Sequence, residues 1–110
     1  MIDSLLMKRI NWSTEKSQLL KESRGVCFED LVFHIEKGDV LDDYLHPNQR
    51  KYAGQRIMVI GFDNYAYLVP YVEDEEELFL KTIIPSRKAT EKYFGEDHES
   101  KTVKRRKRNP

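Results

Sequence analysis

The sequence predicts a single α+β domain in which two helices precede a small twisted antiparallel sheet and a short helix closes the fold. Three observations support this class. Two helical segments in the first half of the chain each end at a glycine, three alternating apolar runs lie between residues 56 and 84, and a last helical segment follows a serine.

The first predicted helix is indicated by its two ends. Ser13 is a suitable N-cap for a helix that runs to about Arg24, where Gly25 ends it. We expect Leu19 and Leu20 to supply its buried stripe.

A second helix is predicted over residues 28–37, with Gly38 as its stop. Its apolar residues recur at helical spacing: Phe28, Leu31, Val32 and Ile35. A closing helix is expected from Ser86 to about Phe94, with Gly95 as its stop.

Strands are predicted at residues 8–12, 40–45, 56–62, 65–72 and 78–84. Asp63 and Asn64 both tolerate positive φ, so they predict a tight hairpin. Pro70 interrupts what should be a central strand, because it has no N–H for the ladder. We therefore expect a β-bulge at Pro70.

Composition limits the class of protein. The chain has 110 residues, enough for one modest core, and 35% of them are charged, against a usual value of roughly 25%. No run reaches the roughly 20 apolar residues that cross a bilayer. The single cysteine excludes a disulfide framework and a cysteine-based zinc cluster. We expect a cytoplasmic protein with no membrane partner and no cofactor.

The net charge of zero hides an asymmetry. Residues 96–110 contain six bases and three acids, which leaves 13 of the 19 bases and 16 of the 19 acids for residues 1–95. We therefore expect one folded domain over residues 1–95 and a disordered basic tail over residues 96–110. The tail bases, among them Lys104, Arg105 and Arg106, suit non-specific phosphate binding or, as an alternative, solubility.

Four short motifs in fixed order resemble the BrnT family of bacterial toxins, which has the RelE-like ribonuclease fold. The resemblance covers about residues 8–94. The motifs are Ile10-Asn11-Trp12, Gly25-Val26-Cys27-Phe28-Glu29-Asp30, Arg56-Ile57-Met58-Val59-Ile60-Gly61 and Ile83-Ile84-Pro85-Ser86-Arg87-Lys88-Ala89-Thr90.

This resemblance implies the toxin half of a type II toxin–antitoxin system. Such a protein is a ribonuclease that cleaves mRNA without a metal, free or on the ribosome, and a cognate antitoxin protein neutralises it. Contact with operator DNA is implied only through the antitoxin.

Cleavage of RNA by attack of its own 2′-OH needs cationic side chains next to the phosphate. Arginine suits this role because its guanidinium can bind two phosphate oxygens at once. Arg87 is the first candidate for this phosphate clamp, with an ion pair to Glu91 as the alternative. Lys88 is a second RNA contact. Tyr93 is a candidate proton donor, although packing on the sheet is favoured for it. Arg56 matches the family's other arginine. As an alternative, it balances the negative charge of the acidic loop at residues 73–77.

Lys81 and a stripe of three tyrosines, Tyr65, Tyr67 and Tyr71, complete the candidates. If the helices cover the Ala66 face of the strand, the stripe stays open beside Lys81 and offers aromatic platforms for bases. Binding of a protein partner is an equal alternative for these tyrosines. His46, in a turn, is an alternative acid or base.

The rival interpretation is a non-catalytic binding module that keeps the scaffold and engages a protein or nucleic acid. The acidic body favours it. So do two departures from the family pattern: Ser23 and Arg24 replace the usual Lys-His pair, and Glu91 and Tyr93 replace an Arg/Glu pair.

Overall fold

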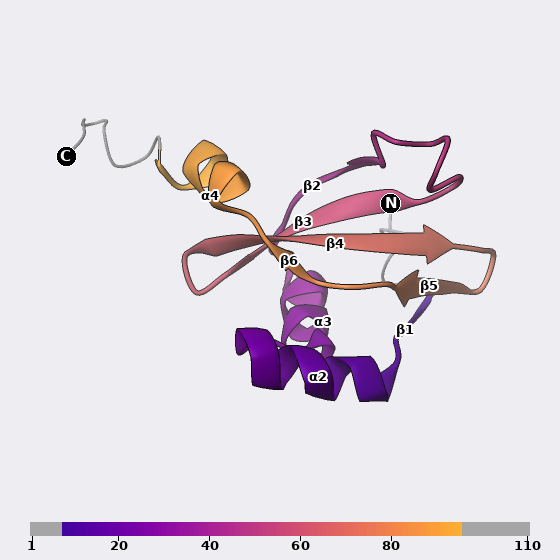
Figure 1. Ribbon diagram of the computed structural model, residues 1–110, viewed down its shortest axis with the longest axis horizontal. Helices are drawn as coiled ribbons and strands as arrows, with labels where there is room; N and C mark the ends of the chain where they lie inside the picture. The colour runs from indigo at the N-terminus through magenta and orange to yellow at the C-terminus, as the bar shows by residue number, and fades with distance from the viewer. Residues whose placement is uncertain (1–7, 96–110) are drawn as a thin grey trace.

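The computed structural model describes residues 8–95, and the predicted tail lies outside them. Helices α2 and α3 lie on one side of a six-stranded sheet, and α4 lies on the other (Figure 1). No helix of the described part is long and apolar enough to cross a membrane. In chain order the elements are β1 (Arg9–Asn11), α2 (Thr14–Arg24), α3 (Phe28–Lys37), β2 (Val40–Leu45), β3 (Arg56–Phe62), β4 (Tyr65–Glu73), β5 (Glu77–Leu80), β6 (Ile84–Pro85) and α4 (Arg87–Tyr93).

The caps place the two early helices where the sequence predicts them. The hydroxyl of Ser13 accepts the N–H of Lys16 at 3.1 Å, and the helix ends at Gly25 with φ 77°. Helix α3 ends at Gly38 with φ 93°. Both conformations are left-handed, which glycine adopts without a steric penalty.

The buried stripe of α2 differs from the expectation. Leu20 is 6% exposed and Ser17 is 2% exposed, whereas Leu19 is 59% exposed. Residues three apart share a face of a helix, so the turn that buries Ser17 and Leu20 points Leu19 outward. The Ser17 hydroxyl accepts the N–H of Phe28 at 2.9 Å and donates to Glu29 at 2.6 Å, which joins α2 to α3.

The sheet has the order β1-β5-β4-β3-β2, with β6 also pairing with β4. It is mixed rather than antiparallel throughout, because β1 runs parallel to β5. The α+β class is confirmed, and so is the β3–β4 hairpin: Asp63 and Asn64 have φ of 58° and 62°.

The predicted bulge at Pro70 is wrong. Pro70 pairs in register with Ile57, and the irregularity of this sheet lies instead in β2, between Val40 and Asp42. The carbonyl of Pro70 accepts the N–H of Lys81 at 2.8 Å. In an antiparallel strand the N–H and C=O of a residue point the same way, so the missing N–H faces the gap where β5 has ended and β6 has not begun.

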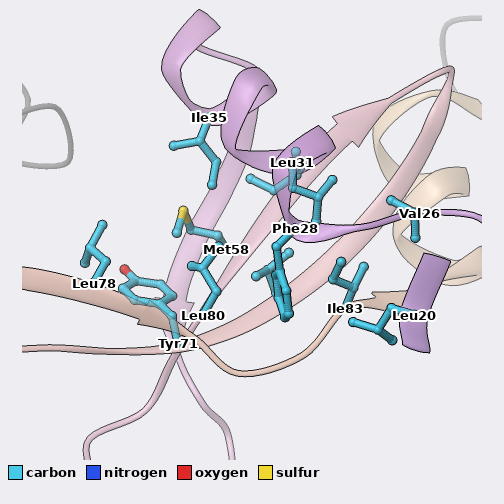
Figure 2. Packing of buried hydrophobic residues seen from close by; sticks show 12 residues of the cluster. Leu20, Val26, Phe28, Leu31, Ile35, Met58, Tyr71, Leu78, Leu80 and Ile83 are labelled. Carbon is cyan, nitrogen blue, oxygen red and sulfur yellow. The ribbon is translucent and has the colours of Figure 1, made fainter. Parts of the chain in front are cut away.

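The core lies between the sheet and helices α2 and α3. Met58 and Ile60 of β3, Val69 and Tyr71 of β4, and Leu78 and Leu80 of β5 point toward the helices. Figure 2 shows four of these side chains, Met58, Tyr71, Leu78 and Leu80, next to apolar residues of the helical layer and the α2–α3 connection: Leu20, Val26, Phe28, Leu31 and Ile35.

Helix α4 begins as predicted and ends one residue earlier. The Ser86 hydroxyl caps it by accepting the N–H of Ala89 at 3.0 Å. Its C-cap is Phe94, with φ −120°, so Gly95 is not the left-handed stop that the sequence suggested.

Two neighbouring leucines give a matched stability test of α2. Leu20→Ala removes buried methyl groups and is expected to cost about 2–5 kcal/mol, whereas Leu19→Ala at the surface should change stability by about 0.5 kcal/mol or less. Urea unfolding of both variants measures the difference. Equal losses would contradict the orientation of this helix.

Candidate functional site

A groove with a volume of about 330 Å³ lies between α4 and the sheet, on the side away from α2 and α3. We call it the α4 groove. Its size falls at the lower end of the roughly 300–1,000 Å³ range typical of ligand sites. The lining combines apolar, phenolic, cationic and acidic groups: Val59, Leu68, Ala89, Ser86, Tyr44, Tyr93, Lys88, Lys92 and Asp42.

Backbone and hydroxyl hydrogen bonds hold α4 against the start of β4. The N–H of Ser86 donates to the carbonyl of Ala66 at 3.1 Å, and the N–H of Ala66 donates to the Thr90 hydroxyl at 2.9 Å. That hydroxyl in turn donates to the Ser86 carbonyl at 2.7 Å. These bonds satisfy the backbone N–H and C=O of Ala66 and fix the first turn of α4 against the sheet.

One hydrogen bond crosses the groove from α4 to β2. The Tyr93 hydroxyl donates to Asp42 Oδ2 at 2.6 Å, and Asp42 Oδ1 accepts the N–H of Asp43 at 2.8 Å. The bond to Asp42 raises the pKa of Tyr93 to about 12. The same bond is the main reason that the pKa of Asp42 lies below its usual range.

The cations of this region come from α4. Lys88 and Lys92 line the groove, four residues apart, as neighbours on one face of a helix are. Arg87 is exposed at the first position of α4 and is not part of the lining. No ion pair within residues 8–95 joins Arg87 to Glu91, which was its alternative role.

Arg56 belongs to a different cluster, on the side of the sheet that α2 and α3 cover. Its Nε lies 3.1 Å from Asp43 Oδ1, and the Tyr71 hydroxyl donates to Asp43 Oδ2 at 2.8 Å. Burial, and then the bond to Asp43, raises the pKa of Tyr71. The expectation that Arg56 balances the charge of the acidic loop at residues 73–77 is therefore wrong, because its carboxylate partner is Asp43 of β2.

The tyrosine stripe also lies on the covered side. Tyr71 is 1% exposed in the core, Tyr67 packs against the core, and Tyr65 contacts Tyr67 with ring centroids 5.4 Å apart. Burial raises the pKa of Tyr67. The prediction of an open stripe beside Lys81 is wrong, because the helices cover the face of β4 that carries the tyrosines rather than the face of Ala66.

Lys81 is exposed just after β5, with its Nζ 5.7 Å from the ring centroid of Phe79. Phe79 stands between Leu78 and Leu80, whose side chains are in the core, so its ring points to the opposite side of the sheet. Lys81 is not among the residues that line the α4 groove.

The structure thus brings two predicted residues, Lys88 and Tyr93, into one groove and adds three that the sequence reasoning missed. The three are Asp42, Tyr44 and Lys92. A signal existed for Lys92, since its spacing from Lys88 places both on one helix face.

Three further predictions have simple outcomes. Lys104, Arg105 and Arg106 lie outside the described residues. His46 is engaged in its turn, where its Nδ1 accepts the N–H of Asn48 at 3.0 Å and its ring packs on Tyr52. Among residues 8–95, no three histidine, cysteine or acidic side chains gather as metal ligands would.

Comparison with protein-family models, with curated proteins and with solved structures finds no match to this chain.

The bond between Tyr93 and Asp42 predicts a pH-dependent stability. Because the pKa of Tyr93 is raised above the ordinary value of about 10, its stabilisation is complete below pH 10 and is lost as the pH rises through about 12. Tyr93→Phe should cost about 1 kcal/mol at pH 7, and the difference from the natural protein should vanish toward pH 12.

Urea unfolding at pH 7 and at pH 12 measures this difference, and tyrosinate absorbance follows the titration. Tyr65→Phe is the control at pH 7, since the Tyr65 hydroxyl makes no hydrogen bond within the described residues. A cost for Tyr93→Phe that persists unchanged at pH 12 would contradict the assigned bond.

Proposed function

We propose that this protein is a ribonuclease toxin of the type II class, which cleaves mRNA and is neutralised by a cognate antitoxin. The observation that carries the proposal is the α4 groove, which two lysines, two phenols and three apolar residues line, with Arg87 exposed next to Lys88 in the chain. The BrnT-like order of motifs in the sequence supports the same function. Action on mRNA places the protein in the cytoplasm.

In the proposed reaction the ribose 2′-OH loses its proton to solvent water, and its oxygen attacks the adjacent phosphorus. The bond to the 5′-oxygen breaks, which leaves a 2′,3′-cyclic phosphate and a 5′-hydroxyl that has gained a proton. Arg87 and Lys88 supply positive charge to the phosphate oxygens. Tyr93, with a pKa of about 12, is a proton donor at neutral pH rather than a base.

Lys81, Arg56 and the tyrosines of β4 have weaker support as parts of this site. The Arg56 guanidinium is committed to Asp43, and Tyr71 is buried in the core. Tyr65 and Tyr67 are on the α2 and α3 side of the sheet, where contact with the antitoxin suits them better than contact with RNA in the α4 groove. The tail bases Lys104, Arg105 and Arg106 remain a predicted non-specific RNA contact.

A specific observation favours the second candidate, a non-catalytic binding module. Tyr93, the phenol of the groove assigned as proton donor, already donates its proton to Asp42 in a hydrogen bond of 2.6 Å. A hydroxyl held in this way contributes to stability whether or not a reaction takes place.

Expression of the natural chain is expected to arrest growth, and purified protein is expected to cleave RNA with or without ribosomes. Arg87→Ala should lower the cleavage rate about a hundredfold, because a charge-stabilising donor is lost. Lys51→Ala, which removes an exposed lysine of the β2–β3 connection, is the matched control and should leave the rate unchanged.

The neighbouring gene product provides the test of the partner. Co-expression of the small protein encoded next to this chain should restore growth, and any operator DNA should bind only when that protein is present. RNA that stays intact in every condition, with oligonucleotides still bound, would reject the nuclease and favour the binding module.

A further inference from the structure

The α4 groove has the chemistry of a site for one nucleotide. Val59 and Leu68 of the sheet and Ala89 of α4 give it an apolar lining, and Tyr44, a residue that is 36% exposed, also lines it. An unstacked base packs on such apolar and aromatic surfaces. Lys88 and Lys92 project from one face of α4 and provide point charges for the phosphates on either side.

Asp42 contributes only hydrogen-bond acceptors to the α4 groove. An ionised carboxylate accepts hydrogen bonds at about four positions and donates none. Two of these positions are used, one on each oxygen, by the Tyr93 hydroxyl and by the N–H of Asp43. Each oxygen of Asp42 therefore keeps an acceptor position for a ligand.

The four RNA bases differ in what they present to a carboxylate. Guanine has two adjacent donors on its Watson–Crick edge, N1–H and the N2 amino group. Adenine and cytosine place an acceptor next to their amino group, and uracil has one N–H between two carbonyl oxygens. A paired acceptor such as a carboxylate therefore complements guanine best.

We propose that the α4 groove holds one unpaired guanine of single-stranded RNA and that Asp42 selects it. The proposal rests on the action on RNA proposed above and adds the base preference of that site. Asp42 is a specificity-determining residue in this scheme, while the lysines of α4 hold the backbone without regard to sequence.

Binding of 2′-fluoro oligonucleotides tests the preference without cleavage, because they lack the attacking hydroxyl. The probes are uridine decamers with a single central guanine, inosine, adenine or uracil, measured by fluorescence anisotropy at a fixed salt concentration. The natural chain is expected to bind the guanine probe roughly five- to a hundredfold more tightly than the uracil probe. The inosine probe, which lacks the N2 amino donor, should fall between them.

Asp42→Asn keeps the size of the side chain and replaces one acceptor by a donor, so the difference between guanine and inosine should disappear. Glu75→Gln makes the same change of charge in the turn between β4 and β5, at the other end of the sheet from α4 (Figure 1), and should leave the order of the probes unchanged.

The outcomes distinguish the proposed guanine preference from the proposed ribonuclease function on which it rests. Equal binding of all probes, or a guanine preference that survives Asp42→Asn, overturns the role of Asp42 while RNA cleavage can stand. Failure to bind any probe overturns the inference, and the cleavage assay with natural RNA and ribosomes then decides the proposed function separately.

Discussion

The two-residue alternation of β4 decides where each candidate site residue lies. Val69 and Tyr71 point to the layer of α2 and α3, and Ala66 and Leu68 point to α4. Because alternate side chains of a strand point to opposite faces, the face that α2 and α3 cover determines the side on which every residue of β4 lies. Here that coverage places the tyrosines of β4 in or beside the core, and Leu68 is the residue of β4 that lines the α4 groove.

Two consecutive aspartates of β2, a strand at one edge of the sheet, show the same alternation of faces. Asp42 faces α4 and accepts the hydroxyl of Tyr93, while Asp43 faces the helical layer and accepts that of Tyr71. One strand thus anchors a phenol on each side of the sheet. Sequence reasoning selected Tyr93 as a phenol on the closing helix near Arg87. It could not find Asp42, since Tyr93 and Asp42 are 51 positions apart and no local pattern joins them.

The elements themselves were largely predictable, because local chemistry defines their ends. Ser13, Gly25 and Gly38 bound the early helices, and Asp63 with Asn64 makes the hairpin. The packing of the faces was not predictable in the same way. β4 carries apolar side chains on both sides, so its pattern alone does not tell which side meets the helices, and the break opposite Pro70 depends on a neighbouring strand.

The parallel pairing of β1 with β5 has a consequence for how the chain acquires its structure. Ile10 lies beside Leu78, a partner that is synthesised much later. Until the ribosome has released β5, the first strand has no neighbour in the sheet, and closing that long loop opposes its docking through lost chain entropy. The sheet is therefore completed only after β5 has been synthesised, and a chain that stops before β5 leaves β1 unpaired.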